Sequence, residues 1–310
     1  MDDIDKADMT KKGLLTLKYG DPGNWSWGPR LRDKAGYLTP DDIYELAVCD
    51  LVHPDTDWLD VGCGRDLFSQ NPKTAKILAA RCRSLTGLDP SANIFENPLL
   101  QHRHQGTMQE FSPGYRYDLI TLRMVAEHVT DPKEAVEALA HLARPGGRVV
   151  IYTVNKWSPA SLVAAMTPMA VHHAVKHVLW KAEERDTFPT AYKMNTRSTL
   201  KRLFQTAGFR EESFRYLDDT RIFHRFKWLN IIELAAWRAL KWIGLRYPEN
   251  CLFGIYVYGV AAQPRSGGQP MEAASDLAAR DDRPPSAPRQ DERASDGQHL
   301  RAPLTASPTR

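Results

Sequence analysis

Short apolar runs alternate with segments of helical period between residues 39 and 155 of the chain. Helices are predicted to begin at Pro40 and Pro72, because a capping side chain precedes each proline and proline suits the first helical position. Residues 132–143 have the period of an amphipathic helix. Buried strands are predicted at residues 58–61, 84–88, 117–122 and 148–154. Strands that alternate with helices in this way favour βαβ units and a parallel sheet.

The alternation changes after residue 155. A further helix is predicted to open at residues 195–198 and to run to the stop at Gly208, after an apolar segment at residues 157–180. Residues 209–217 and 252–260 are predicted strands that pair antiparallel at the sheet edge, with a strongly apolar helix at residues 229–245 between them. The whole pattern predicts an α/β fold.

Composition separates a folded part from a tail. The tail, residues 264–310, holds seven prolines and no Phe, Trp or Tyr, so it cannot bury enough apolar surface to offset its ordering entropy. It is predicted to be disordered, which leaves about 263 residues for one decorated domain. The 41 basic and 38 acidic residues of the chain give a net charge of only +3, so the bulk charge does not call for a nucleic acid as partner.

Cysteines and terminal sequence predict a compartment. Cys49, Cys63, Cys82 and Cys251 are scattered, without a C-x-x-C pair, which is typical of free thiols in a reducing cytosol. The charged N-terminus lacks the apolar stretch of a signal peptide, and nowhere do eighteen apolar residues run together. We expect a cytoplasmic protein that does not span a membrane.

A glycine turn follows the first predicted strand, in Asp60-Val61-Gly62-Cys63-Gly64. Glycines at this place let the backbone approach a ligand closely, and Asp89, at the end of the next strand, can accept bonds from ribose hydroxyls. A dinucleotide fingerprint would have a third glycine where Leu67 stands, and the next helix start is delayed to Pro72. S-adenosylmethionine, which has no phosphate, therefore fits better than NAD. The alternative is an ordinary tight turn from strand to loop.

Five motifs occur in order: residues 59–64, 87–91, 117–121, 127–132 and 142–147. Together they resemble the class I S-adenosylmethionine-dependent methyltransferases, in the small-molecule branch that includes ubiquinone-type enzymes. The resemblance implies a doubly wound, Rossmann-like, mostly parallel sheet of seven strands, with an antiparallel edge hairpin and a helical insertion after the fifth strand. Residues 1–38 would then be an N-terminal cap, residues 39–155 the cofactor-binding core, and residues 156–263 the acceptor-site insertion and completing elements of the same domain.

The resemblance also implies roles for single residues. Asp60 would meet the methionine amino group, the Gly62-Cys63-Gly64 turn would pass beside the cofactor, and Asp89 would hold the ribose hydroxyls.

Further roles follow less closely from the family pattern. Thr107 stands where relatives carry an acid toward the adenine, Met108 would offer backbone contact and an apolar face, and the carbonyl of Arg123 would face the methionine end. Asp66 stands where many relatives have glycine, so either the turn differs or Asp66 itself contacts the cofactor.

The catalytic prediction concerns Glu127 and His128. Methyl transfer gains much of its rate from alignment of the acceptor, and a base helps when the acceptor is a hydroxyl. His128 is the first candidate, since imidazole titrates near neutrality, and Glu127 is the second. The alternative is that both cap the loop before Asp131. Met124 replaces the first acid of the Glu-x-x-Glu-His cluster that binds cations in some relatives, so no metal is expected.

Residues 186–197 are a candidate acceptor segment. Tyr192, Asn195 and Arg197 are predicted to bind the substrate, with an ordered connecting loop as the alternative. The histidines 172, 173 and 177 are interpreted as part of a lid rather than a metal site.

The helix at residues 229–245 allows two interpretations. Trp237 and Trp242, with flanking Arg225, Lys227 and Lys241, would suit peripheral contact with a membrane or a lipid-linked acceptor, but packing on the sheet is favoured. The predicted function is transfer of a methyl group from S-adenosylmethionine to a hydroxyl or amine of a small-molecule, glycan or lipid-linked acceptor. The alternative is a noncatalytic module of the same fold that binds S-adenosylmethionine.

Overall fold

The computed structural model describes residues 9–159, 161–162, 189–221, 223–245 and 247–259. The chain divides into one unit over Met1–Pro264 and a second over Arg265–Arg310. The predicted disordered tail, most of the insertion after the fifth strand and the three histidines at 172, 173 and 177 lie outside the described residues. All of the described residues belong to the first unit.

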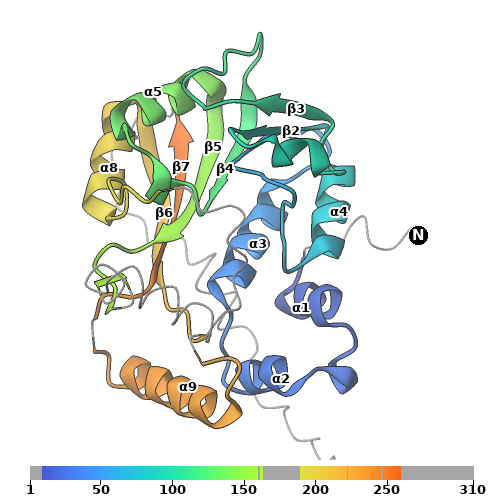
Figure 1. The fold of residues 1–310 in the computed structure, drawn as a ribbon, viewed down its shortest axis with the longest axis vertical. Coiled ribbons are helices and arrows are strands. Elements are labelled where there is room, and N and C mark those ends of the chain that lie inside the picture. Colours follow the sequence, from blue (N-terminus) through green and yellow to red (C-terminus); the bar gives the residue numbers. More distant parts are fainter. Residues whose placement is uncertain (1–8, 160, 163–188, 222, 246, 260–310) are drawn as a thin grey trace, which may run out of the picture. The chain divides into compact units, whose positions relative to one another are not determined.

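Seven strands form one sheet within the described residues (Figure 1). In chain order they are β1 (Asp57–Val61), β2 (Ser84–Asp89), β3 (His102–Gln105), β4 (Tyr117–Arg123), β5 (Ala143–Val154), β6 (Phe209–Leu217) and β7 (Cys251–Tyr258). Their spatial order is β3-β2-β1-β4-β5-β7-β6, and β7 is antiparallel to both of its neighbours. The predicted mostly parallel sheet and its antiparallel edge pair are confirmed.

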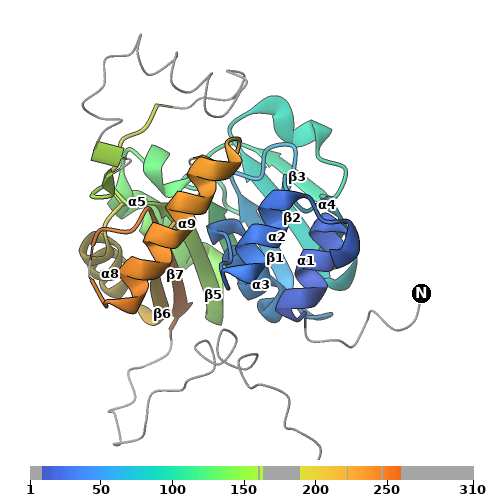
Figure 2. The same ribbon diagram turned by 90° about the horizontal axis from the view of Figure 1, so that it is seen from below.

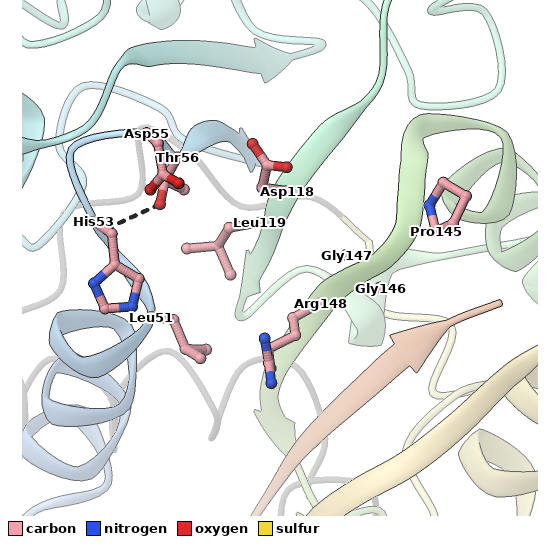
Figure 3. Close-up of a pocket in the computed structure, with 10 residues that line it drawn as sticks. All are labelled: Leu51, His53, Asp55, Thr56, Asp118, Leu119, Pro145, Gly146, Gly147 and Arg148. Atoms are coloured by element: carbon pink, nitrogen blue, oxygen red, sulfur yellow. Dashed lines mark hydrogen bonds between the residues drawn. The ribbon is translucent and has the colours of Figure 1, made fainter. Parts of the chain in front are cut away.

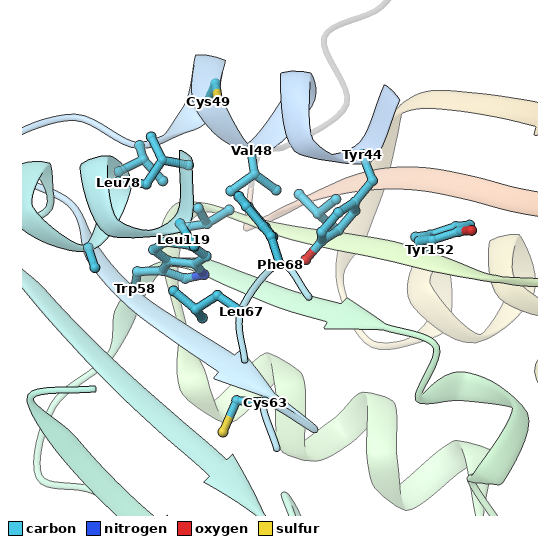
Figure 4. Packing of buried hydrophobic residues seen from close by; sticks show 14 of the residues in the cluster. Tyr44, Val48, Cys49, Trp58, Cys63, Leu67, Phe68, Leu78, Leu119 and Tyr152 are labelled. Carbon is cyan, nitrogen blue, oxygen red and sulfur yellow. The ribbon is translucent and has the colours of Figure 1, made fainter. Parts of the chain in front are cut away.

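Helices cover both faces of this sheet. The first core cluster joins β1 and β4 to α3 (Pro40–Leu51) and α4 (Pro72–Arg81). Figure 4 shows its centre, where the fully buried ring of Trp58 lies beneath Val48 and Leu78. The second cluster packs α5 (Pro132–Leu142) and α8 (Arg197–Thr206) on the other face. Successive β1 residues alternate between the clusters, as a strand buried on both faces requires.

Local capping explains where these helices begin. The Thr39 hydroxyl accepts the Asp42 amide at 3.1 Å while the Asp42 carboxylate accepts the Thr39 amide at 2.9 Å, which completes a capping box. Asn71 caps α4 and Asp131 caps α5 through the side chain alone, which accepts backbone amides of the first turn, and each stands directly before proline. The predicted helix starts at Pro40, Pro72 and Pro132 are confirmed.

Several elements differ from the sequence expectation. The pattern did not predict β3, because its four residues are polar and exposed, nor α1 (Lys11–Tyr19), the short η1 (Pro22–Asn24) and α2 (Trp27–Lys34). The strand predicted at residues 148–154 begins earlier, because β5 starts at Ala143 and includes Pro145, Gly146 and Gly147. The pairing of β5 with β4 is irregular there, and Gly146 takes a φ of 82°.

The helix α9 (Lys227–Trp242) does not lie on a face of the sheet as the sequence favoured. It packs against α2 beyond the edge at which the parallel strands end (Figures 1 and 2). Its Trp237 meets Tyr37 edge to face, with ring centroids 5.1 Å apart. None of the helices in the described ranges is long and apolar enough to cross a membrane.

Candidate active site

The carboxyl ends of β1 and β4 mark the switch point of the sheet. From β1 the chain continues outward through β2 to β3, whereas β4 leads to β5 on the other side. Ligands in doubly wound sheets bind outside the carboxyl ends at this point. Asp60, Asp89 and Arg123 all lie at or beside these strand ends, so the fold brings together residues that the sequence marked separately.

The turn after β1 requires glycine. Gly62 and Gly64 have φ values of 70° and 46°, which side chains rarely adopt. A Cβ at Gly62 would lie 2.3 Å from Val125 Cγ2, whereas the space beside Gly64 is open to 4 Å. Cys63 between them is buried in the first core cluster. Gly62 itself is exposed, and the buried side chain of Cys63 anchors the turn in the core.

Asp89 joins this turn to β2. Its Oδ2 accepts the Gly64 amide at 2.9 Å, and its Oδ1 accepts the Ser91 amide at 2.8 Å. A carboxylate offers about four acceptor positions, so both oxygens retain capacity for a pair of hydroxyl donors.

Asp60 lies at the end of a buried hydrogen-bonded chain. The indole of Trp58 donates to the Thr121 hydroxyl at 2.8 Å, and that hydroxyl donates to Asp60 Oδ1 at 2.6 Å. Burial raises the pKa of Asp60 to about 7, although the bond from Thr121 opposes the rise. An approaching cation would favour the ionised form of this carboxyl.

The remaining predicted cofactor residues lie around the same edge. Met108 is buried in the second core cluster, and Thr107 directs its amide and hydroxyl to the Glu110 carboxylate at 3.1 and 2.8 Å. Asp66 is exposed on the loop after the glycine turn. The guanidinium of Arg123 lies 3.9 Å from Asp41.

A cavity of about 810 Å³ opens at this carboxyl edge, and we call it the acceptor-side cavity. Residues far apart in the sequence line it, among them Trp27, Arg32, Asp41, Met124, Tyr152, Asp219 and Arg221. Met124 takes a φ of 57° directly after β4 and donates its amide to the Tyr152 carbonyl at 2.7 Å. None of these residues was among the predicted substrate contacts, because no local motif marks them.

Paired charges stiffen the wall of the acceptor-side cavity. Arg221 bonds Asp219 through Nε and Nη2, both at 2.7 Å, and its Nη1 lies 2.7 Å from Asp41. Lys18 is similarly held by Asp42 at 2.7 Å. The wall thus carries ion pairs together with the aromatic surface of Trp27 and Tyr152.

A second cavity of about 270 Å³ lies at the opposite edge (Figure 3). It is lined by Asp55 and Thr56 just before β1, by Asp118 at the start of β4 and by Arg148. These are the amino ends of parallel strands, away from the switch point, so this cavity is not the candidate site.

The side chains of Glu127 and Asn195 are joined through the buried hydroxyl of Thr153. The Thr153 hydroxyl donates to Glu127 Oε2 at 2.6 Å and accepts Asn195 Nδ2 at 2.9 Å. The Glu127 carbonyl accepts the amides of Ala191 and Tyr192 at 2.7 and 3.1 Å. Burial raises the pKa of Glu127. Three predicted site residues, Glu127, Tyr192 and Asn195, therefore lie together. Their hydrogen bonds connect β5 to the segment before α8.

His128 and Arg197 take other places. His128 Nδ1 lies 3.1 Å from the Pro189 carbonyl. Arg197 bonds Glu211 at 2.7 Å and lies over the Phe214 ring, on the side of α8 and β6. Within the described residues, the lining of the acceptor-side cavity includes neither of them, nor Tyr192 or Asn195.

Comparison with known families decides the general identity of the chain. Residues 29–213, more than half of the chain, match a family described as a methyltransferase domain. The chain belongs to this methyltransferase family. Its family is that of the S-adenosylmethionine-dependent methyltransferases, and S-adenosylmethionine is the cofactor of that family. The predicted family is confirmed, and with it the enzyme class and cofactor of that family.

Similar proteins include ubiquinone biosynthesis O-methyltransferases. Those of Aromatoleum aromaticum and Serratia proteamaculans are 30% and 31% identical over 138 residues, which cover 39% of this methyltransferase chain and 56% and 55% of theirs. The chain spans about half the length of the curated relatives it matches.

Among solved structures, the N-methyltransferase NodS from Bradyrhizobium japonicum, in complex with S-adenosyl-L-homocysteine, is 15% identical and has a TM-score of 0.40. The match covers 79% of this chain and 97% of that one. The cyclopropane synthase MmaA2 from Mycobacterium tuberculosis is 14% identical, with a TM-score of 0.43 and coverage of 69% and 82%.

Proposed function

We propose that this methyltransferase transfers a methyl group to a hydroxyl or amine of a small-molecule acceptor that occupies the acceptor-side cavity. The observation that carries the proposal is the position of that cavity. It begins at Met124 and Tyr152, at the ends of β4 and β5, beside the glycine turn that follows β1. A volume of about 810 Å³ lies within the range of small-molecule sites, which are usually mostly apolar with a few polar groups.

The residues at the strand ends fit S-adenosylmethionine. Asp89 retains acceptor capacity beside an exposed glycine turn, which suits the ribose diol, and the buried Asp60 carboxyl suits an ammonium group. The turn at Gly62, Cys63 and Gly64 would lie alongside the cofactor. When bound, S-adenosylmethionine supplies an electrophilic methyl group on a sulfonium. We assign Thr107, Met108, Asp66 and Arg123 to the rim of the same site as the family pattern implies.

The contribution of the protein to the reaction is mainly alignment. The ion pairs of Arg221 fix one wall of the acceptor-side cavity, and the rings of Trp27 and Tyr152 offer flat apolar surface to the acceptor. Holding the acceptor atom in line with the methyl group accounts for a large part of such a rate enhancement. His128 lies outside the described lining of the acceptor-side cavity, so it is the proposed base only for a hydroxyl acceptor that extends from the cavity toward Pro189. Glu127 positions the segment that carries Ala191 and Tyr192.

The acceptor can be found with a labelled-methyl transfer assay on fractionated cell extract that includes lipid and glycan fractions. With the acceptor in hand, Trp27→Ala should raise KM at least about tenfold, since an aromatic contact surface is lost. Tyr115→Ala is the matched control, because Tyr115 is exposed before β4, at the amino edge. An unchanged KM in Trp27→Ala, with normal binding of S-adenosylmethionine, would place the acceptor elsewhere. No labelled product in any fraction would count against the proposed acceptor classes.

A further inference from the structure

The inner face of α9 is fixed to the rest of the domain. Asn230 is fully buried and donates through Nδ2 to the Thr220 carbonyl at 2.7 Å. Leu234 is 3% exposed, and Trp237 one turn later packs against Tyr37. These residues recur every three to four positions, so they define one side of the helix and determine which side faces outward.

The opposite side of α9 is apolar and open to solvent. We call it the outer face, and it consists of eight exposed residues: Trp228, Leu229, Ile232, Ala235, Ala236, Ala239, Trp242 and Ile243. Trp228, Ile232 and Trp242 are 77%, 64% and 87% exposed. At 1.5 Å per residue the two tryptophans lie about 21 Å apart along the helix. A face of this length without a charged member is unusual on a protein surface and marks an interaction site.

Basic residues accompany the outer face. Residues 223–245 contain four Lys and Arg against one Glu. One of the four, Lys241, is ion-paired with Glu249 at 2.6 Å and with Asp218 at 3.4 Å. Exposed Arg238 lies one turn before Trp242 on the same side of the helix, and exposed Lys227 lies at the end of the helix that carries Trp228. The single acid, Glu233, accepts Asn230 Nδ2 at 2.9 Å and thus lies toward the inner side. The surroundings of the outer face are therefore electropositive.

We propose that the outer face of α9 docks on an anionic phospholipid bilayer, with the helix lying in the plane of the interface. Tryptophan prefers the interface between headgroups and acyl chains, and adjacent Lys and Arg bind anionic headgroups. A second copy of the chain is the less suitable occupant, since a symmetric contact would bring two cationic rims together.

The docked orientation would also bring the acceptor-side cavity close to the membrane. An apolar groove of about 330 Å³ runs along α9 between Leu229, Trp237 and Leu240, and it shares Asp219 and Asn250 with the lining of the acceptor-side cavity. A lipid-linked acceptor would thus have a short path from the bilayer. Docking of α9 on a bilayer does not depend on which acceptor the enzyme methylates.

The test measures co-sedimentation of the full chain with vesicles of phosphatidylcholine alone and of phosphatidylcholine mixed with phosphatidylglycerol. We expect binding to the mixed vesicles that weakens with salt and falls at least about tenfold in Trp228→Ala/Trp242→Ala. The charge variant Lys227→Glu/Arg238→Glu should lose the preference for the anionic lipid. The matched control is Phe95→Ala/Tyr115→Ala, two rings that are 60% and 45% exposed elsewhere on the domain.

Thermal unfolding and binding of S-adenosylmethionine should be the same in the tryptophan variant as in the parent, since both rings are exposed. The proposal is overturned if the parent stays in the supernatant with mixed vesicles, or if the tryptophan variant binds them equally well. It is likewise overturned in favour of a second copy if the parent is a dimer in sedimentation velocity and the tryptophan variant is a monomer, with no binding of either to vesicles.

Discussion

The backbone amide of Gly64 donates to Asp89 Oδ2 at 2.9 Å, and this bond joins the turn after β1 to the end of β2. The two residues are 25 positions apart in the chain. The bond orients the carboxylate toward the exposed turn, where glycine leaves open space. One acidic side chain thereby fixes both the turn after β1 and the chain that follows β2.

Replacement of Asp89 should weaken binding of S-adenosylmethionine. Asp89→Ala removes charge-assisted bonds worth about 1.5–3 kcal/mol each, so calorimetry should show a loss of affinity of at least about tenfold. Glu96→Ala is the control, because Glu96 ends the neighbouring short helix η2 (Ala92–Glu96) and its described partner is the half-exposed Arg65. Equal affinity in Asp89→Ala and the parent would refute the placement of the ribose.

Gly62→Ala should destabilise the fold. The new Cβ would meet Val125 Cγ2 at 2.3 Å and would force a φ of 70° on alanine. We expect a loss of about 1–3 kcal/mol in the free energy of unfolding from urea titration. The double variant Gly62→Ala/Val125→Ala should recover the stability lost to the steric contact with Val125. It should still lose the stability that the positive φ costs an alanine. Gly114→Ala, where no atom lies within 4 Å, is the control, and an equal loss there would contradict this account.

Asp60 should make stability depend on pH. Its pKa is about 7 in the folded chain against 3.8 for the free side chain, so the folded state holds a proton that the unfolded state releases between these values. The free energy of unfolding should therefore fall as pH rises from about 4 to about 7, by up to about 4 kcal/mol. Asp60→Asn should remove this pH dependence in urea titrations. Parallel curves of unfolding free energy against pH for variant and parent would show that Asp60 is not its source.

Binding of S-adenosylmethionine should show the opposite pH trend. An ammonium group favours the ionised Asp60 carboxylate, so affinity should rise as pH increases from about 5.5 to about 7. Thr121→Val removes the hydroxyl that donates to Asp60 and so should weaken affinity at neutral pH. Calorimetry across this range checks both effects. A pH-independent affinity in the parent would show that the Asp60 carboxylate does not contact the ammonium group of the ligand.

Glu127 should act through structure rather than proton transfer. Glu127→Gln retains an acceptor for the Thr153 hydroxyl and should keep stability and turnover, whereas Glu127→Ala leaves that buried group unpaired at a cost of about 1–3 kcal/mol. His128→Ala should keep stability but lose turnover if the acceptor is a hydroxyl. Loss of turnover in a stable Glu127→Gln would instead assign the base role to Glu127.

The order of elements could be predicted because its causes are local. A capping side chain directly before Pro40 or Pro72 settles a helix start within one turn, and the glycines at 62 and 64 mark a turn that other residues could not make. By contrast, β3 carries no apolar face, so its sequence lacks the periodicity that reveals a strand.

The sequence by itself determined the α/β class, the carboxyl ends of the parallel strands and the glycine turn after β1, since each depends on residues within a few positions of one another. Only the tertiary structure decided what surrounds them. Arg221 forms an ion pair with Asp41 in the wall of the acceptor-side cavity. The buried carboxylate of Glu127 accepts a hydrogen bond from the Thr153 hydroxyl. The rings of Trp228 and Trp242 are exposed to solvent. These outcomes depend on contacts between distant segments, where burial and charge pairing are set by packing rather than by neighbours in the chain.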